Sequence, residues 1–259
     1  MGLCNAGSTF SRIMQIAMQG LNFSICLCYL DDVIVYADSI PSHIQRLRAV
    51  FQRLREAGLK LKPSKCHLLQ EEVTFLGHVV SAAGIATDER KIKAVQEWPV
   101  PKNIHEVRAF VGLTSYYRKF IAQYSTVCAP LHALTSKFAK FEWTKKCDEA
   151  FTRLKELLTT APILALPTDD DPFVLDVDAS GFSLGAVLSQ QQGGQEKVIC
   201  YASRMLSRTE RNYCCTRREL LAVVFFVKQF RAYLLGKKFL IRTDHAALTW
   251  LRKTPELIG

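Results

Sequence analysis

The stretch Tyr29-Leu30-Asp31-Asp32 places two adjacent acids between two apolar runs, at residues 23–28 and 33–37. Both runs are short and rich in β-branched and aromatic residues, which favours two strands of a hairpin with the acids at or near the turn. Ionised carboxylates beside buried strands lose hydration, and a divalent cation that takes oxygen ligands, such as Mg²⁺, would offset that loss. The alternative interpretation is an ordinary polar turn.

The chain has 259 residues, enough for two or three small domains with separate cores. Its hydrophobic fraction of 49% and charged fraction of 22% are ordinary for a globular protein and exclude wholesale disorder. The formal net charge of +10 favours a polyanionic partner, and it favours nucleic acid over a membrane surface.

The nine cysteines predict neither a zinc site nor a disulfide framework. No C-x-x-C spacing occurs, the number is odd, and several lie inside apolar runs, where a free thiol packs as a small hydrophobe. This usage fits a reducing, intracellular compartment, cytoplasmic or nuclear. Residues 13–30 carry no charge, but polar residues interrupt them and the pattern indicates an amphipathic helix followed by a strand, not a membrane span.

A basic segment follows the acid pair. Apolar residues recur at helical spacing from Ile44 onward, and Gly58 is a natural end for that helix. Seven basic side chains crowd the helix and its exit: Arg46, Arg48, Arg53, Arg55, Lys60, Lys62 and Lys65. They form either a solvated helix face or a surface that contacts nucleic-acid phosphates.

The middle of the chain contains the clearest boundary. Residues 73–80 are predicted to form one strand with a glycine kink. Trp98-Pro99-Val100-Pro101 then interrupts regular structure, because prolines break helices and central strands. Asn103 and Glu106 begin the next helix as a capping box. The aromatic residues at 110–120 are interpreted as part of the hydrophobic core, in preference to a base-stacking platform.

The second half alternates between strands and helices. A helix is predicted at residues 147–158, strands at 173–178, 185–189 and 198–202, a loop at 190–195, a long helix from 216 to about 235, and a further strand at 239–243.

Three acids occupy informative positions in this pattern. Asp178 ends the first of these strands, Glu219 lies in the first turn of the long helix, and Asp244 follows the last strand. If the first and fourth strands are neighbours, the three carboxylates meet and can hold two Mg²⁺ ions for phosphodiester hydrolysis. Singly, each acid has another explanation. Asp178 could be a turn residue, Glu219 could form a capping box with Thr216, and Asp244 could cap a helix at 245–251.

The acid pair and its neighbours resemble a known family. Tyr29-Leu30-Asp31-Asp32 is similar to the Y-x-D-D palm motif of reverse transcriptases, in the form carried by gypsy-type LTR retrotransposons. Residues 2–10 resemble that family's G-L-x-N-A-P-x-T-F template-grip segment, with Gly7 in place of the usual proline. Residues 60–78 resemble the end of the palm, and 110–121 the segment from thumb to connection.

The C-terminal acids extend this resemblance. The segments around Asp178, residues 185–190, residues 201–204, Glu219 and Asp244 resemble the retrotransposon ribonuclease H domain in order and spacing. Three strands, a helix and a fourth strand is also the opening order of that fold. By position, these three acids match metal-binding acids of the family. Asp176 is the competing candidate on the same strand, and Asp178 is preferred because it precedes an Ala-Ser turn.

The resemblance implies an α/β fold truncated at both ends: an α+β palm-type polymerase fragment followed by a ribonuclease H-like mixed sheet with helices. We expect a palm remnant at 1–85, thumb and connection helices at 86–165, and a nuclease-like domain at 166–259. It further implies Mg²⁺, with Mn²⁺ as an alternative, bound by Asp31, Asp32, Asp178, Glu219 and Asp244 as catalytic residues. The implied partners are RNA–DNA hybrid, template-primer nucleic acid and the rest of a Pol polyprotein, with no membrane.

Two acids of the family pattern have no counterpart in these 259 residues, namely a third palm aspartate before Met1 and a fourth nuclease acid after Gly259. DNA synthesis is therefore expected to be lost, and RNA hydrolysis to be weakened. The alternatives are a catalytically inactive nucleic-acid-binding remnant and a host-recruited interaction module.

Overall fold

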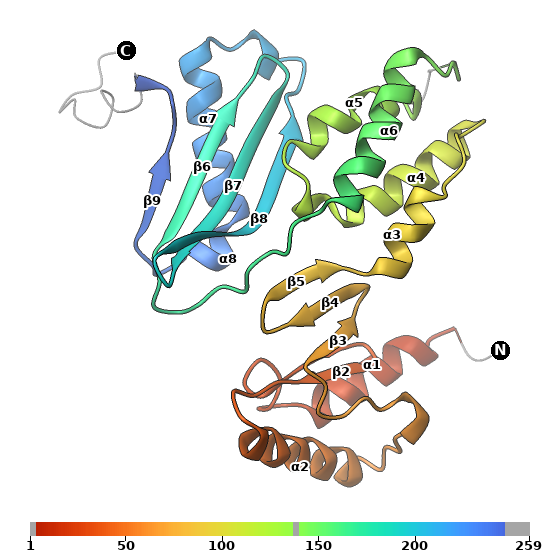
Figure 1. Cartoon of the computed structure of the whole chain (residues 1–259). Helices are drawn as coiled ribbons and strands as arrows, with labels where there is room; N and C mark the ends of the chain where they lie inside the picture. The colour runs from red at the N-terminus through yellow and green to blue at the C-terminus, as the bar shows by residue number, and fades with distance from the viewer. Residues whose placement is uncertain (1–3, 137–139, 247–259) are drawn as a thin grey trace. The chain divides into compact units, whose positions relative to one another are not determined.

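The computed structural model describes residues 4–136 and 140–246 (Figure 1). The chain forms two compact units, Met1–Leu76 with Val80–Ala82, and Gly77–Val79 with Ala83–Gly259. Both units combine helices with small sheets, so the predicted α/β class is confirmed.

The first unit packs two helices against a hairpin. Its elements up to residue 65 are α1 (Ala6–Ala17), β1 (Cys26–Tyr29), β2 (Asp32–Val35), α2 (Ile40–Glu56) and the 3₁₀ turn η1 (Pro63–Lys65). The strands pair antiparallel with Tyr29 opposite Asp32, which confirms the predicted hairpin with the acids at its turn. The core consists of Met14, Ala17, Met18, Cys26, Val50 and Leu54.

The predicted single strand at 73–80 is wrong. The chain forms β3 (Glu72–Phe75), then a turn, then β4 (His78–Ser81), and β5 (Gly84–Thr87) completes a three-stranded sheet in the order β3-β4-β5. Leu76 and Gly77 occupy the turn with φ of 48° and 68°. Two successive left-handed residues reverse the chain direction, so the glycine marks a hairpin and not a kink.

Helices make up the next part of the second unit: α3 (Glu89–Gln96), α4 (Ile104–Tyr116), the 3₁₀ turn η2 (Arg118–Phe120), α5 (Tyr124–Leu134) and α6 (Lys145–Thr159). The predicted proline-rich boundary separates α3 from α4, and the Asn103 side chain accepts from the Glu106 N–H at 3.0 Å, as predicted for the helix start. Phe110, Tyr117 and Phe120 are almost fully buried, as predicted for core residues, whereas Tyr116 is 52% exposed and is not part of the core.

The last part of the second unit is a four-stranded sheet covered by a helix. Its strands are β6 (Phe173–Ala179), β7 (Ser183–Gln192), β8 (Gln195–Met205) and β9 (Phe239–Arg242), in the order β8-β7-β6-β9. The pair β6–β9 is parallel and the other pairs are antiparallel. The η3 turn (Glu210–Asn212), α7 (Cys215–Gln229) and α8 (Arg231–Leu234) follow β8, and α7 packs against β6 and β7.

Two predicted boundaries in this part are wrong. The segment expected as a loop at 190–195 is mostly strand, because the buried Gln190 side chain donates to the backbone oxygens of Thr168 and Asp171 at 2.9 and 2.7 Å. Only the Gly193-Gly194 turn remains between the strands. The long helix predicted to reach about residue 235 ends at Gln229, and α8 follows as a separate turn.

Polar contacts attach the helices of the second unit to the sheet. The Ser125 N–H donates to Ser203 Oγ at 2.9 Å, and the hydroxyls of Thr126 and Ser183 lie 2.8 Å apart. The Arg118 guanidinium donates to the Ser203 carbonyl. Because Arg118 begins η2 while Ser125 and Thr126 lie in the first turn of α5, the short segment between those two elements is fixed beside β7 and β8.

All nine cysteines lie in the described part of the chain and are free. Among the described residues, no helix is both long enough and apolar enough to cross a membrane.

We expect Gly84→Ala to destabilise the second unit strongly. Gly84 has φ of +133°, and a Cβ at this position would lie 2.2 Å from the Leu164 carbonyl oxygen. The neighbouring Ile85 forms a backbone bridge to Leu164, so the two segments cannot separate without losing hydrogen bonds. The cost should be about 2–4 kcal/mol in urea unfolding.

The matched control is Gly112→Ala. Gly112 lies inside α4, and a Cβ there meets nothing within 4 Å. Alanine favours a helix interior over glycine by about 0.5–1 kcal/mol, so this variant should gain stability. Equal effects of the two substitutions would contradict the close approach at Gly84.

Glu210→Gln should remove a stabilising contribution that depends on pH. Arg204 donates to both Glu210 carboxylate oxygens at 2.8 and 2.9 Å and, with the Ser207 N–H, holds the pKa of Glu210 at about 2, against an ordinary 4.5. A carboxyl group whose pKa is lower in the folded than in the unfolded state stabilises the folded protein at pH values above the unfolded-state pKa. This contribution is lost as the pH falls toward 2.

At pH 7 the variant should therefore lose about 2 kcal/mol of unfolding free energy, allowing for the partial exposure of both side chains. The difference from the parent chain should narrow as the pH is lowered from 5 to 3. Urea titrations over that range measure it, and a difference that stays constant with pH would contradict the ion pair's role.

Candidate metal centre

Three carboxylates meet where β6 ends. Asp178 is the penultimate residue of β6, Asp244 lies two residues after β9, and Glu219 is the fifth residue of α7. Because β6 and β9 are parallel neighbours, their C-terminal ends lie at the same edge of the sheet. One carboxylate oxygen from each residue lies within 4.8 Å of the other two. The structure thus brings together the three acids that the sequence had singled out.

The three acids differ in their surroundings. Glu219 is only 4% exposed, whereas Asp178 and Asp244 are exposed. Burial raises the pKa of Glu219, and the nearby charges of Asp178 and Asp244 raise it further. A hydrogen bond from the Ala179 N–H and the proximity of His245 act in the opposite direction. The cluster therefore carries more negative charge than its own residues neutralise.

The cluster fits a divalent cation. Glu219 Oε2 is buried and accepts no hydrogen bond from the described residues, so a ligand to this oxygen would relieve a cost that the fold otherwise bears. Carboxylate oxygens are the ligands that Mg²⁺ prefers, and the two exposed aspartates leave room for the waters and phosphate oxygens that it retains.

The capping box offered as the alternative explanation for Glu219 is wrong. The residue before the helix is Cys214, and no side chain caps the helix there. Thr216 is inside α7, and its hydroxyl lies 3.0 Å from His245 Nε2. Glu219 points toward the acid cluster and not toward its own helix terminus. The helix proposed at 245–251 lies almost wholly outside the described residues.

Asp176, the competing acid on β6, has a different partner. Arg242 on β9 donates to both of its carboxylate oxygens, at 2.5 and 2.6 Å. The same guanidinium contacts Glu196 on β8 at 2.6 and 2.9 Å and holds the pKa of Glu196 below its usual range. Asp176 is thus neutralised within the sheet, and Asp178 is the acid of this strand that joins the cluster.

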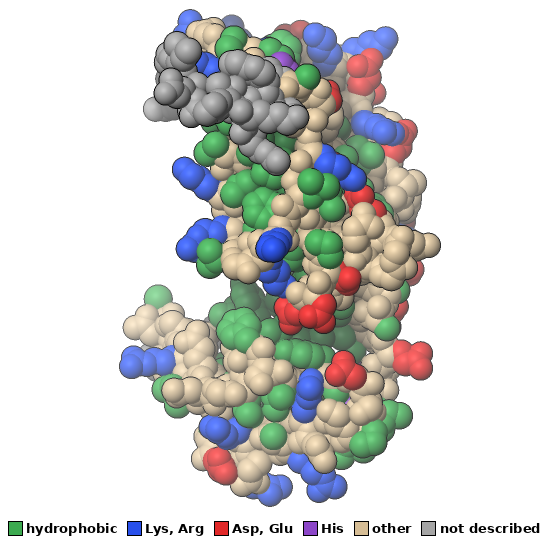
Figure 2. Space-filling view, turned by 90° about the vertical axis from the view of Figure 1, so that its left-hand side faces the viewer, with side chains coloured by type: hydrophobic (Ala, Val, Ile, Leu, Met, Phe, Trp, Pro, Cys, Tyr) green, Lys and Arg blue, Asp and Glu red, His purple; other side chains and the backbone are tan. Residues whose placement is uncertain are grey.

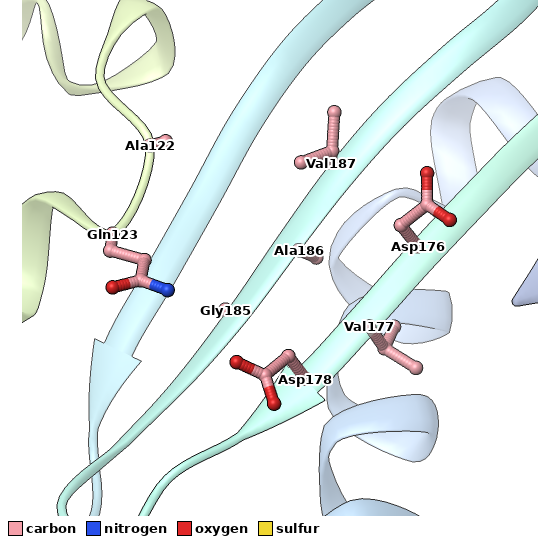
Figure 3. Close-up of a pocket in the computed structure, with 8 residues that line it drawn as sticks. All are labelled: Ala122, Gln123, Asp176, Val177, Asp178, Gly185, Ala186 and Val187. Atoms are coloured by element: carbon pink, nitrogen blue, oxygen red, sulfur yellow. The ribbon is translucent and has the colours of Figure 1, made fainter. Parts of the chain in front are cut away.

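A shallow pocket of about 160 Å³ lies beside Asp178 (Figure 3). Residues of β6 and β7 form its floor, and Ala122 and Gln123, which precede α5, line it from the helical side. No sequence motif marks Gln123 as a site residue. It lies more than fifty residues before Asp178, and only the packing of α5 against β8 brings it to the sheet.

The acid pair of the first unit is placed as predicted but is not buried. Asp31 lies in the turn between β1 and β2, Asp32 begins β2, and both side chains are exposed. The loss of hydration expected for them therefore does not arise in this structure. In the described residues, the cluster at Asp178 is the one group of three or more acids, histidines or cysteines close enough to hold a metal.

The seven basic residues do not form one continuous row. Arg48 and Arg55 lie seven residues apart on one side of α2, while Arg46 and Arg53 lie on another. Arg46 is partly engaged, since it donates to the Tyr36 carbonyl at 2.6 Å. Lys60, Lys62 and Lys65 follow the helix and are exposed. On the face drawn in Figure 2, Lys and Arg side chains are spread over the surface and do not gather in one patch.

Comparison with protein families divides the chain in the same order. Residues 1–80 match the family described as reverse transcriptase (RNA-dependent DNA polymerase). Residues 143–241 match the RNase H-like domain found in reverse transcriptase, which includes Asp178 and Glu219.

Similar sequences are found along nearly the whole chain. The retrovirus-related Pol polyproteins from transposons 297 and gypsy of Drosophila melanogaster are 44% and 34% identical, over 98% and 96% of this chain. The Tf2-3 transposon polyprotein of Schizosaccharomyces pombe is 31% identical over 95%. The chain spans 24%, 25% and 19% of the length of these relatives.

Solved structures share the fold. A foamy viral protease-reverse transcriptase in complex with double-stranded DNA matches with a TM-score of 0.85 and 24% identity, over 98% of this chain and 45% of that one. The same kind of protein in complex with an RNA/DNA hybrid matches with a TM-score of 0.82, over 98% of this chain and 34% of that one. The chain therefore belongs to the retrovirus-related Pol polyproteins of gypsy-type retrotransposons, and it joins reverse transcriptase sequence to an RNase H-like domain.

Proposed function

We propose that the sheet domain hydrolyses the RNA strand of RNA–DNA hybrids, with Asp178, Glu219 and Asp244 as its metal-binding catalytic residues. The observation that carries this proposal is the meeting of three carboxylates within 4.8 Å, one of them buried with an unpartnered oxygen. The proposed ions are Mg²⁺, with Mn²⁺ as a substitute. When bound, they supply activation of the attacking water and stabilisation of the leaving oxygen.

The residues of the chain contribute position and charge to this reaction. Asp178 and Asp244 are exposed and therefore accessible to a bound hybrid, while the Ala179 N–H holds the buried Glu219 carboxylate by a hydrogen bond. Water adds to phosphorus, the bond from phosphorus to the 3′ oxygen breaks, and that oxygen leaves with a proton. The negative charge of the cluster without metal would repel the phosphate, so catalysis by this site should require a divalent cation.

We further propose that the chain has three functional parts: a reverse transcriptase palm segment at 1–85, thumb and connection helices at 86–165, and the nuclease domain at 166–259. Three separate hydrophobic cores support this division, with members at 14–54, 92–164 and 165–234. Asp31 and Asp32 are the proposed metal-binding acids of the palm, supported by their exposed position at a hairpin turn.

The proposed partners are RNA–DNA hybrid and template-primer nucleic acid, inside the cell, together with the rest of a Pol polyprotein. The net charge of +10 and the foamy viral relative solved with a hybrid support a nucleic-acid partner. Arg46, Arg48, Arg53, Arg55, Lys60, Lys62 and Lys65 are the proposed phosphate contacts. Free cysteines throughout the chain support a reducing compartment.

Asp178→Asn should strongly slow the cleavage of a labelled RNA strand in an RNA–DNA hybrid. Removing one ligand charge from the cluster should slow metal-dependent cleavage by about 100-fold or more. The rate is measured with Mg²⁺, with Mn²⁺ and with a chelator. The matched control is Asp170→Asn. Asp170 is an exposed aspartate before the start of β6, and this variant should cleave the hybrid at the parent rate. Metal-independent cleavage, or no cleavage by the folded parent chain, would refute the proposed function.

Glu219→Gln should separate metal binding from folding. Without metal, the variant should be at least as thermally stable as the parent, since it loses a buried charge that faces two like charges. Mn²⁺ should raise the melting temperature of the parent by a few degrees and leave the variant unchanged, since a ligand that binds only the folded state stabilises it. An equal rise of the melting temperature in both proteins would mean that Mn²⁺ binds at a site other than the acid cluster.

A further inference from the structure

Gln123 has an unusual place between two elements of the second unit. It separates η2 from α5 and has φ of 52° and ψ of 31°, the left-handed region that side chains other than glycine and asparagine seldom occupy. Its side chain borders the pocket beside Asp178 (Figure 3). Strained residues of this kind occur preferentially at ligand sites.

The surrounding contacts fix Gln123 in this conformation. Ile121 before it and Tyr124 after it are 1% and 2% exposed. The hydrogen bonds from Ser125 to Ser203 and between Thr126 and Ser183 then hold the first turn of α5 to the sheet. The Gln123 side chain consequently projects over the sheet from a backbone that cannot shift without breaking these contacts.

The pocket places two polar groups on either side of a glycine. Gly185 on β7 is paired directly with Asp178 on β6. A Cβ on Gly185 would lie 3.8 Å from Gln123 Cγ, so the glutamine stem passes over the open strand position. In the described part of the chain, the Gln123 carboxamide has no hydrogen-bond partner, and Figure 3 shows it on the side of Gly185 opposite the Asp178 carboxylate.

We propose, resting on the nuclease function proposed above, that Gln123 recognises a ribose 2′-hydroxyl of the RNA strand next to the cleaved phosphodiester. A carboxamide both donates and accepts hydrogen bonds, as a hydroxyl does, and it carries no charge that would attract any phosphate equally. The 2′-hydroxyl is the group that distinguishes RNA from DNA. A DNA strand in the same place leaves the carboxamide without this partner, so the helical part supplies sugar specificity to the nuclease site.

The test compares binding of two duplexes of identical sequence, an RNA–DNA hybrid and a DNA duplex, by fluorescence anisotropy with the full chain. Ca²⁺ replaces Mg²⁺, because its larger and looser shell suits the site without supporting the reaction. The parent chain should prefer the hybrid. Gln123→Ala should lower that preference by about 2- to 10-fold, the effect of one hydrogen bond, and leave affinity for the DNA duplex unchanged.

Two further variants separate recognition from folding. Gln123→Gly removes the carboxamide and also relieves the left-handed backbone, so it should lose the preference while its melting temperature rises. Gln229→Ala makes the alanine substitution at an exposed glutamine at the end of α7, ten residues beyond Glu219, and should keep the parent preference.

The inference is overturned if the parent shows no preference for the hybrid, if both Gln123 variants retain it, or if they weaken binding to both duplexes equally. Cleavage with Mg²⁺ is scored separately. A chain that prefers the hybrid through Gln123 but cleaves nothing would overturn the proposed nuclease function and support the recognition.

Discussion

The parallel pairing of β6 with β9 is the constraint on which the acid cluster depends. β9 has only four residues and pairs from Phe173 opposite Phe239 to Asp176 opposite Arg242. A shift by one residue would turn every β9 side chain to the other face of the sheet and move Asp244 away from Asp178. Arg242 opposes such a shift, because it contacts Asp176 on the neighbouring strand and Glu196 on β8 at the same time.

The burial of Glu219 is costly, and the rest of the domain compensates for it. A carboxylate that is 4% exposed, close to two other acids and with one oxygen unpartnered, destabilises the fold in the absence of a cation. The sheet and α7 tolerate this cost because their apolar faces meet in a closely packed core that includes Leu175 and Phe226, both without exposed surface. Stability given up at one point for chemistry is common at functional sites.

The sequence predicted the elements whose signal is local. Alternation identified β6, helical spacing identified α2 and α7, and adjacent acids between apolar runs identified the β1–β2 hairpin. It failed where a single contact decides the conformation. Leu76 takes a left-handed turn that only the following glycine suggests, and the buried amide of Gln190 extends β7 through a segment whose composition indicates a loop.

The candidate site likewise contains residues that the local sequence pattern marks and a residue that only tertiary packing brings to it. Its acids lie at or just after strand ends or in the first turns of a helix, so element order and family resemblance were enough to select them. Gln123 has no motif, and its place beside Asp178 results from the packing of α5 against β8 and from hydroxyl contacts between Thr126 and Ser183. The helical part and the sheet have distinct hydrophobic cores, yet the pocket is lined by residues of both parts: Ala122 and Gln123 before α5, and residues of β6 and β7. A boundary drawn between cores therefore cuts through the site, and the helical part contributes to it through its fixed position on the sheet.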